Sequence, residues 1–348
     1  MTRARWISQC TLALLLVATL GLGGLSSANA AQQPKAEGGA KLIRSSETGV
    51  ARMASRRAWT KEEMERARPY PIPQKKGQAT RNTPRLPGTA ALPSAPKASQ
   101  ADGPAGQVPF KKPANAGTAA GPVTPLSFPV NPGVYGSYPF STIGKLFFFQ
   151  YGYEYVCSAA LVKGHGIWTA GHCAHPGNGD PDGWSYEAIF VPQYYETDDP
   201  VGICFVTDWI TPSDWYYNGL PDGLDYDYAG GNISCDVEDI TDYTGYLGLA
   251  WNQSTTQFWR IVGYPAAPPF TGENQVQCAS GRKAFGFGTP LTIGATCDMT
   301  GGSSGGPWFI YGGYINGNVS YGDSDYPGLI FSPYLTSLAG DLWDLLEP

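Results

Sequence analysis

Three short motifs contain residue types that can cooperate in nucleophilic catalysis. They are Thr169-Ala170-Gly171-His172-Cys173, Asp227-Tyr228-Ala229 and Gly302-Ser303-Ser304-Gly305-Gly306-Pro307. A serine hydroxyl is a weak nucleophile near neutral pH and needs a base within hydrogen-bond reach. Histidine suits that task, and a carboxylate on its other ring nitrogen fixes the tautomer. We therefore predict Ser304 as the nucleophile, His172 as general base and then acid, and Asp227 as the orienting carboxylate.

Two of these assignments have a neighbouring rival. Asp225 lies two residues before Asp227, and Ser303 directly precedes Ser304. The choice of Asp227 rests on the Tyr-Ala that follows it, and the choice of Ser304 rests on its Gly-x-Ser-Gly-Gly-Pro frame. The glycines allow a tight turn that aims backbone amides at one point. We expect the amides of Gly302 and Ser304 to form an oxyanion hole, in which one donor stabilises the transition state by roughly 3 kcal/mol.

Taken together, the motifs resemble those of the chymotrypsin/trypsin-like serine peptidases. Thr-Ala-x-His-Cys, Asp-aromatic-Ala and Gly-x-Ser-Gly-Gly-Pro occur in that family in the same chain order. The resemblance covers about residues 125–348. It implies an all-β fold of two six-stranded antiparallel Greek-key barrels with a C-terminal helix. It also implies a secreted serine endopeptidase that hydrolyses peptide bonds through an acyl-enzyme, without a cofactor.

The resemblance extends to the walls of a substrate pocket. Val319-Ser320-Tyr321-Gly322 resembles the family's pocket-wall strand, and Pro327-Gly328-Leu329-Ile330 resembles the strand that follows it. This similarity implies four substrate-binding residues: Ser320, Tyr321, Gly322 and Gly328.

Asp298 lies six residues before Ser304, at the position that gives trypsins their preference for Arg and Lys. A buried carboxylate there would attract a cationic side chain. The stretch from Asp298 to Gly305 also resembles bacterial glutamyl endopeptidases. Cleavage after Glu or after an apolar residue therefore stays open. A catalytically silent binding module of the same fold is a further alternative.

Six cysteines remain once Cys10 of the N-terminal apolar segment is set aside. An even number in an exported chain indicates three disulfides, and the absence of a C-x-x-C spacing makes a zinc site a weak alternative. The resemblance implies a bond between Cys157 and Cys173 beside the histidine. Proximity along the chain suggests that the other four pair as Cys204–Cys235 and Cys278–Cys297.

Composition and charge narrow the class of protein. Only 15% of the residues are charged, and 45 Gly and 30 Pro favour a loop-rich β protein over a helical bundle. Residues 31–120 carry 16 Lys/Arg and 6 Asp/Glu (+10), whereas residues 121–348 carry 5 Lys/Arg and 23 Asp/Glu (−18). Because so acidic a C-terminal part repels phosphate backbones, we expect no nucleic-acid partner.

The first 123 residues read as an export signal followed by a basic leader. Residues 1–30 combine two arginines, a short apolar run and Ala28-Asn29-Ala30, which is typical of a cleaved signal peptide and not of a membrane span. Residues 31–123 are rich in Pro and Ala and are expected to be a largely disordered propeptide. Thr60 and Glu63 form a capping box for one short helix near residues 59–67.

The leader's charge leads us to expect that it masks the catalytic domain or assists its folding, as in a zymogen. We place the catalytic domain at residues 124–348, with a first barrel at about 124–240 and a second at about 241–348. We expect a secreted monomer that acts on protein or peptide substrates. Aspartates at 180–182 and 222–225 could coordinate calcium, although solvated loops are the commoner explanation.

Overall fold

The computed structural model of the chain describes residues 41–48, 57–75, 126–196, 198–310 and 313–348. The expected signal peptide, and the leader apart from residues 41–48 and 57–75, lie outside these residues. Among the described helices, none is long and apolar enough to cross a membrane.

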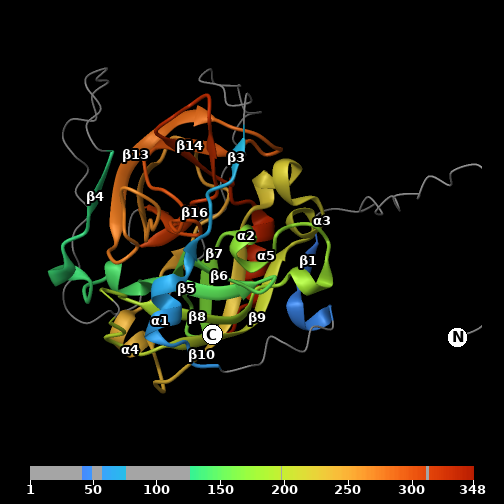
Figure 1. Ribbon diagram of the computed structural model, residues 1–348. Coiled ribbons are helices and arrows are strands. Elements are labelled where there is room, and N and C mark those ends of the chain that lie inside the picture. The colour runs from blue at the N-terminus through green and yellow to red at the C-terminus, as the bar shows by residue number, and fades with distance from the viewer. Residues whose placement is uncertain (1–40, 49–56, 76–125, 197, 311–312) are drawn as a thin grey trace, which may run out of the picture. The chain divides into compact units, whose positions relative to one another are not determined.

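Six antiparallel strands form a closed barrel in the first half of the catalytic part (Figure 1). The pairing order is β8-β5-β6-β7-β10-β9, and β9 pairs back onto β8. Short β-rich runs at 146–149, 155–157 and 188–191 are typical of strands in the sequence, and they lie within these elements. The strands are β5 (Ile143–Gln150), β6 (Tyr153–Val162), β7 (Gly166–Thr169), β8 (Tyr186–Pro192), β9 (Cys204–Pro212) and β10 (Ala229–Cys235).

The second half forms another, mainly antiparallel sheet with the order β11-β16-β15-β12-β13-β14-β18-β17. In the part of the chain that the structure describes, no pairing closes this path into a ring. The predicted all-β class is confirmed. The strands are β4 (Ser127–Pro129), β11 (Gly248–Leu249), β12 (Phe258–Gly263), β13 (Val276–Phe285), β14 (Ile293–Thr296), β15 (Pro307–Ile310), β16 (Tyr314–Asn318), β17 (Tyr321–Asp323) and β18 (Leu329–Ser332).

Helices are short, and the expected C-terminal helix is confirmed as α5 (Ser337–Leu345). The sequence did not predict α3 (Ser213–Asp222), because Gly219 and Leu220 interrupt its helical backbone and Pro221 follows. The other helices are α2 (Gly171–Ala174) and α4 (Thr241–Thr244), with 3₁₀ turns η1 (Ser45–Glu47), η3 (Pro132–Val134), η4 (Phe140–Thr142), η5 (Pro181–Gly183) and η6 (Leu224–Tyr226).

Two segments of the leader pair with strands of both sheets. Strand β1 (Leu42–Arg44) pairs antiparallel with β9, β2 (Arg68–Pro69) pairs parallel with β6, and β3 (Gln74–Lys75) pairs parallel with β17. The expected short helix is α1 (Lys61–Arg66), and its capping box between Thr60 and Glu63 is confirmed. Figure 1 shows this blue part of the chain running from the first barrel to the second sheet.

Three disulfides hold loops onto the two sheets. They join Cys157 to Cys173, Cys204 to Cys235 and Cys278 to Cys297. The cysteine count indicated three disulfides and the resemblance implied the Cys157–Cys173 bond, whereas the sequence left the pairing of the other four cysteines open. The first of them ties β6 to the helical turn α2, which carries His172.

Candidate active site

Helical turn α2 and the residue after η6 bring His172 and Asp227 together. The Nδ1 atom of His172 lies 2.8 Å from Oδ2 of Asp227, and the backbone amide of His172 donates to Oδ1 at 2.8 Å. The His172 side chain is 2% exposed and that of Asp227 is fully buried. Both carboxylate oxygens of Asp227 therefore bind the histidine residue. They fix the orientation of the ring, so that Nε2 points away from Asp227.

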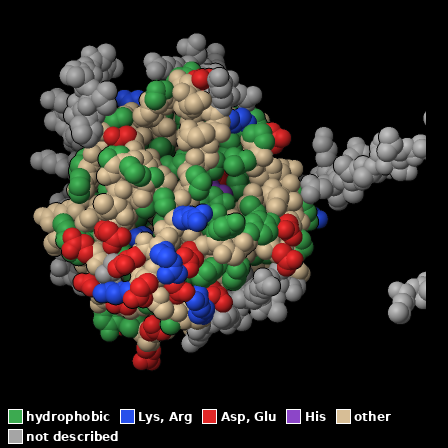
Figure 2. Space-filling model, in the orientation of Figure 1, with side chains coloured by type: hydrophobic (Ala, Val, Ile, Leu, Met, Phe, Trp, Pro, Cys, Tyr) green, Lys and Arg blue, Asp and Glu red, His purple; other side chains and the backbone are tan. Residues whose placement is uncertain are grey.

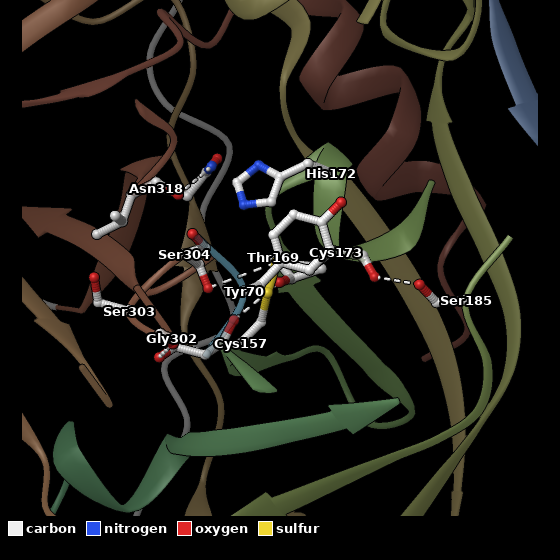
Figure 3. The surroundings of a disulfide bond; sticks show 12 residues. Tyr70, Cys157, Thr169, His172, Cys173, Ser185, Gly302, Ser303, Ser304 and Asn318 are labelled. Atoms are coloured by element: carbon white, nitrogen blue, oxygen red, sulfur yellow. Dashed lines mark hydrogen bonds between the residues drawn. A yellow bond between two sulfur atoms is a disulfide. The ribbon is translucent and has the colours of Figure 1, made fainter. Parts of the chain in front are cut away.

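Ser304 lies on the opposite side of the imidazole. Figure 3 shows its hydroxyl facing the ring of His172, while the Ser303 side chain points away. The Nε2 atom of His172 and the hydroxyl of Ser304 are both buried, and neither has a hydrogen-bond partner. Ser303 instead donates to the Thr300 carbonyl at 2.7 Å. Of the two serines in the motif, Ser304 is the one whose hydroxyl faces the imidazole.

The glycines around Ser304 are required by the backbone. Gly302 has a φ of 93° and Gly305 a φ of 81°. A Cβ atom at Gly305 would lie 2.1 Å from the hydroxyl oxygen of Thr169. The turn is anchored by Ser158, whose amide donates to the Ser304 carbonyl and whose hydroxyl donates to the Gly302 carbonyl, at 2.8 and 2.9 Å. In this conformation the Gly302 amide points away from the turn and donates to the Tyr70 carbonyl at 3.0 Å.

Asp227 accepts one more hydrogen bond, from a residue that the sequence assigned differently. The Ser320 hydroxyl, expected to bind substrate, donates to Oδ2 of Asp227 at 2.5 Å. Asn318 donates to the Asp227 carbonyl at 3.1 Å and accepts from the Trp168 indole at 3.3 Å. The aspartate is thus held in a polar cage whose members come from β16 and from the residue before β17.

Asp225, the rival of Asp227, does not contact His172. Its Oδ2 accepts from the Thr289 amide at 2.8 Å, whereas its Oδ1 is buried without a partner. Burial raises the pKa of Asp225 to about 6. The structure therefore brings together the histidine and aspartate that the motif frame selected, and it places Asp225 in a separate cavity.

The remaining predicted pocket residues lie on β17 and around β18. Asp298 accepts the amide of Leu126 at 3.1 Å through Oδ2, and its Oδ1 is buried without a partner. A Cβ at Gly328 would lie 3.0 Å from the Leu126 side chain. Tyr321 is buried, with its ring 4.8 Å from that of Phe331.

A residue of the leader lies over the site, which the sequence analysis did not predict. The Tyr70 carbonyl accepts from the Gly302 amide at 3.0 Å, and the Tyr70 amide donates to the Val156 carbonyl at 3.0 Å. Its ring centroid lies 5.1 Å from that of His172, and its hydroxyl donates to Gln150 at 2.9 Å. Tyr70 therefore fills the space beside the imidazole and the glycine turn.

Residues 57–75, which we call the covering segment, continue in both directions from Tyr70. Arg57 forms ion pairs with Glu63 and Glu187, and Arg66 forms one with Glu154. Figure 2 shows basic and acidic side chains interspersed over the face where α1 lies. Further on, the Gly322 amide donates to the Pro73 carbonyl at 2.8 Å.

The same region offers no thiolate for a metal. Among the described residues, the one group of ligating atoms close enough together is Cys157, His172 and Cys173, but its cysteines are joined in a disulfide. Asp180, in one of the candidate calcium loops, accepts hydrogen bonds from the Asp182 amide and the Tyr151 hydroxyl. Its side chain therefore caps the turn η5.

Known structures share this architecture. Protease Anisep from Arthrobacter nicotinovorans is 32% identical over 58% of this chain and 94% of its own, with a TM-score of 0.52. A thermostable serine protease, AL20, from an extremophilic microorganism is 32% identical over 59% and 95%, with a TM-score of 0.52. A Glu endopeptidase shares the fold at 19% identity over 64% and 96%, also with a TM-score of 0.52.

No family model and no curated protein sequence matches the chain. The structural similarity nevertheless spans nearly the whole of two proteases at 32% identity. With this similarity and the geometry around His172, the chain belongs to the chymotrypsin-like serine proteases.

Proposed function

We propose that the protein is a secreted serine endopeptidase in which Ser304, His172 and Asp227 act as a catalytic triad. One observation carries this proposal: Nδ1 of His172 lies 2.8 Å from Asp227 Oδ2, and the Ser304 hydroxyl, buried and without a hydrogen-bond partner, faces the same ring. Three disulfides favour an oxidising, extracellular location.

In the proposed reaction, the Ser304 oxygen attacks the carbonyl carbon of a peptide bond while Nε2 of His172 takes the hydroxyl proton. The Gly302 and Ser304 amides stabilise the negative oxygen that forms. The C–N bond then breaks, and His172 gives its proton to the leaving amine. Water, deprotonated by His172, hydrolyses the Ser304 ester and restores the hydroxyl. Asp227 stays ionised and stabilises the imidazolium in both halves.

For primary specificity, we propose cleavage after Arg or Lys, with Asp298 pairing with the side chain. Its Oδ1 is buried and accepts no hydrogen bond, which supports a cationic partner at that atom.

We further propose that the chain is made as a latent precursor whose covering segment inhibits the site. The Tyr70 carbonyl accepts a hydrogen bond from the Gly302 amide, which in the proposed mechanism stabilises the negative oxygen of the transition state. The segment also forms two arginine–carboxylate ion pairs with the catalytic domain, from Arg57 to Glu187 and from Arg66 to Glu154, and its Trp59 ring packs 4.8 Å from Phe149. Its basic charge thus complements the acidic catalytic domain, in line with the mask that the sequence led us to expect.

The direction of the covering segment explains how it can resist cleavage. His172 must protonate the leaving amine, so the part of a substrate that follows the cleaved bond lies on the first-barrel side. The part that precedes the bond then lies along β17. In the covering segment, the residues before Tyr70 pair with β6 and those after it pair with β17. In the peptide bond between Tyr70 and Pro71, the nitrogen therefore lies on the side of β17. His172, which would have to protonate that nitrogen for cleavage, lies on the other side.

The test uses the secreted protein and a fluorophosphonate that labels activated serines. We expect labelling and peptide hydrolysis by the wild type and neither by Ser304→Ala, with Ser303→Ala as the matched control that keeps both. Absence of labelling and hydrolysis in the wild type, after the covering segment has been removed, would favour the silent binding module.

A further inference from the structure

A second cavity opens near the end of the covering segment. It has a volume of about 610 Å³ and lies between the end of α3, the turn η6 and the loop after β13. Carboxylates dominate its polar side chains, and two aromatic residues, Tyr226 and Phe287, also line it. The residues that line the cavity include Asp214, Asp222, Asp225, Phe287 and Thr289.

Asp225 is the buried anchor of this cavity. Asp225 is only 6% exposed, and its Oδ2 accepts a hydrogen bond from the Thr289 amide. Oδ1 is buried without a hydrogen-bond partner. The loop approaches so closely that a Cβ at Gly288, where φ is 100°, would lie 2.4 Å from the Asp225 Cβ. An ionised oxygen fixed in this way is stabilised by a positively charged ligand.

The covering segment places a cation at the rim of the cavity. The Lys75 ammonium lies 3.0 Å from the Phe287 ring centroid and donates to the Pro221 carbonyl at 2.9 Å. Burial lowers the pKa of Lys75, and the charges of Asp222, Asp225 and Asp323 oppose this shift. The chain's own lysine therefore occupies the place that a basic side chain of a substrate would take.

The register along β17 indicates which substrate residue could reach the cavity. Lys75 pairs with Asp323, one residue beyond Gly322, and follows Tyr70 by five residues. A substrate that runs along β17 in the opposite direction presents there a residue about four positions before the cleaved bond.

We propose that this cavity is a substrate subsite for a Lys or Arg side chain about four residues before the cleaved bond. The proposal rests on the proposed endopeptidase function. Phe287 supplies the aromatic face, and Asp225 and Asp222 supply the negative charge. A cation–π contact together with a partly exposed ion pair is worth about a tenfold preference over a neutral side chain.

The first experiment measures kcat/KM of the secreted enzyme on peptides that differ at one position. Lys, Gln or Glu is placed three, four or five residues before the cleaved bond. We expect Lys to exceed Gln about tenfold at one of these positions and Glu to be poorest. In Asp225→Asn and in Phe287→Ala the Lys-to-Gln ratio should fall below about threefold. Asp242→Asn, an exposed change on α4, should keep the wild-type ratio.

The second experiment needs no activity and separates the two proposals. In the full chain carrying Ser304→Ala, hydrogen exchange is measured at the Ser324 amide, which donates to the Lys75 carbonyl. We expect exchange to be at least threefold faster in Lys75→Gln and in Asp222→Asn, and unchanged in Lys41→Gln. If no peptide is cleaved at all, the endopeptidase function fails and the exchange result alone decides the subsite. A flat peptide panel or an unchanged rate in Lys75→Gln overturns the subsite.

Discussion

The carbonyl oxygen of Tyr70 accepts a hydrogen bond from the Gly302 amide at 3.0 Å. A leader residue thus satisfies the backbone donor that a serine protease reserves for the developing oxyanion. The ring of the same residue lies 5.1 Å from the His172 ring. One residue therefore blocks both the electrostatic and the proton-transfer parts of the proposed mechanism.

The first prediction concerns latency. Tyr70→Ala removes the ring contact with His172 and the hydrogen bond to Gln150, so the covering segment should release the site more often. We expect the initial peptidase rate of the unprocessed chain to rise about tenfold or more. Tyr243→Ala, at an exposed position on α4, is the control. An unchanged initial rate would show that the Tyr70 side chain does not hold the segment in place.

The second prediction concerns Ser320 as a positioning residue. Ser320→Ala removes the 2.5 Å hydrogen bond to Asp227 and leaves a buried carboxylate oxygen with one donor fewer. We expect kcat to fall about tenfold with little change in KM, because the bond supports the imidazolium and touches no substrate. Ser324→Ala, exposed just beyond β17, should alter neither constant. A rise in KM at constant kcat would instead assign Ser320 to substrate binding.

The third prediction concerns Asp298. Asp298→Ser should lower kcat/KM for Arg and Lys at the cleaved bond by about a hundredfold, because a buried carboxylate no longer faces the cation. Asp325→Ser, at an exposed position near β17, is the control for the added serine. Unchanged preference for Arg and Lys would remove Asp298 from the specificity. Cleavage after Glu or after an apolar residue by the wild type would assign the pocket to that kind of side chain instead.

The fourth prediction concerns acid stability through His175. This fully buried ring donates to the Asp180 carbonyl and accepts from the Gly177 amide, and burial lowers its pKa to about 4. The unfolded chain gains a proton near pH 6.5, whereas the folded chain gains it near pH 4. Stability is therefore lost as the pH falls between these values, by about 2 kcal/mol at pH 5.

The measurement compares urea unfolding at pH 7.5 and pH 5 in the Ser304→Ala background. In His175→Asn the pH-dependent loss should shrink by that amount, although the variant is less stable at both values. An equal loss in both proteins would place the acid sensitivity elsewhere.

The fifth prediction concerns Asp225, whose ionisation lowers stability as the pH rises, whereas protonation of His175 lowers it as the pH falls. Burial raises the pKa of Asp225 to about 6, and the facing charges are Asp214, Asp222 and Lys75. The unfolded chain loses this proton near pH 3.8 and the folded chain near pH 6, so stability is lost as the pH rises between these values and stays lower above them. We expect Asp225→Asn to unfold with a free energy higher than that of the parent by about 2 kcal/mol at pH 8, with no such gain at pH 4. Exposed Asp222→Asn is the control, and an equal gain at both values would refute the ionisation argument.

The sequence predicted the grouping of His172 and Asp227, because each lies in a local motif whose backbone shape is set by its neighbours. The strands and α5 followed from short β-rich runs and a terminal apolar pattern. The disulfides are confirmed, although only the bond at Cys157 rested on the family resemblance. These features depend on residues close together in the chain or on a pattern shared with many proteins.

The sequence could not predict contacts between distant segments that carry little pattern of their own. The prolines around Tyr70 indicate an extended chain, but they do not indicate which strand it meets or in which direction. The Ser320 position suggested a pocket wall, and only the folded chain turns its hydroxyl onto Asp227. Helix α3 was missed because its interrupted backbone leaves too few regular turns for a helical pattern.

The strand pairings of the leader also bear on the kinetics of activation. Strand β1 pairs with β9 of the first barrel, and β3 pairs with β17 of the second sheet, so the leader is held at two separate places. A cut within residues 76–125 would break none of these pairings and would leave two chains joined noncovalently. Release would then be a dissociation equilibrium, so a dilute solution would become active while a concentrated secretory compartment kept the same cleaved molecules silent.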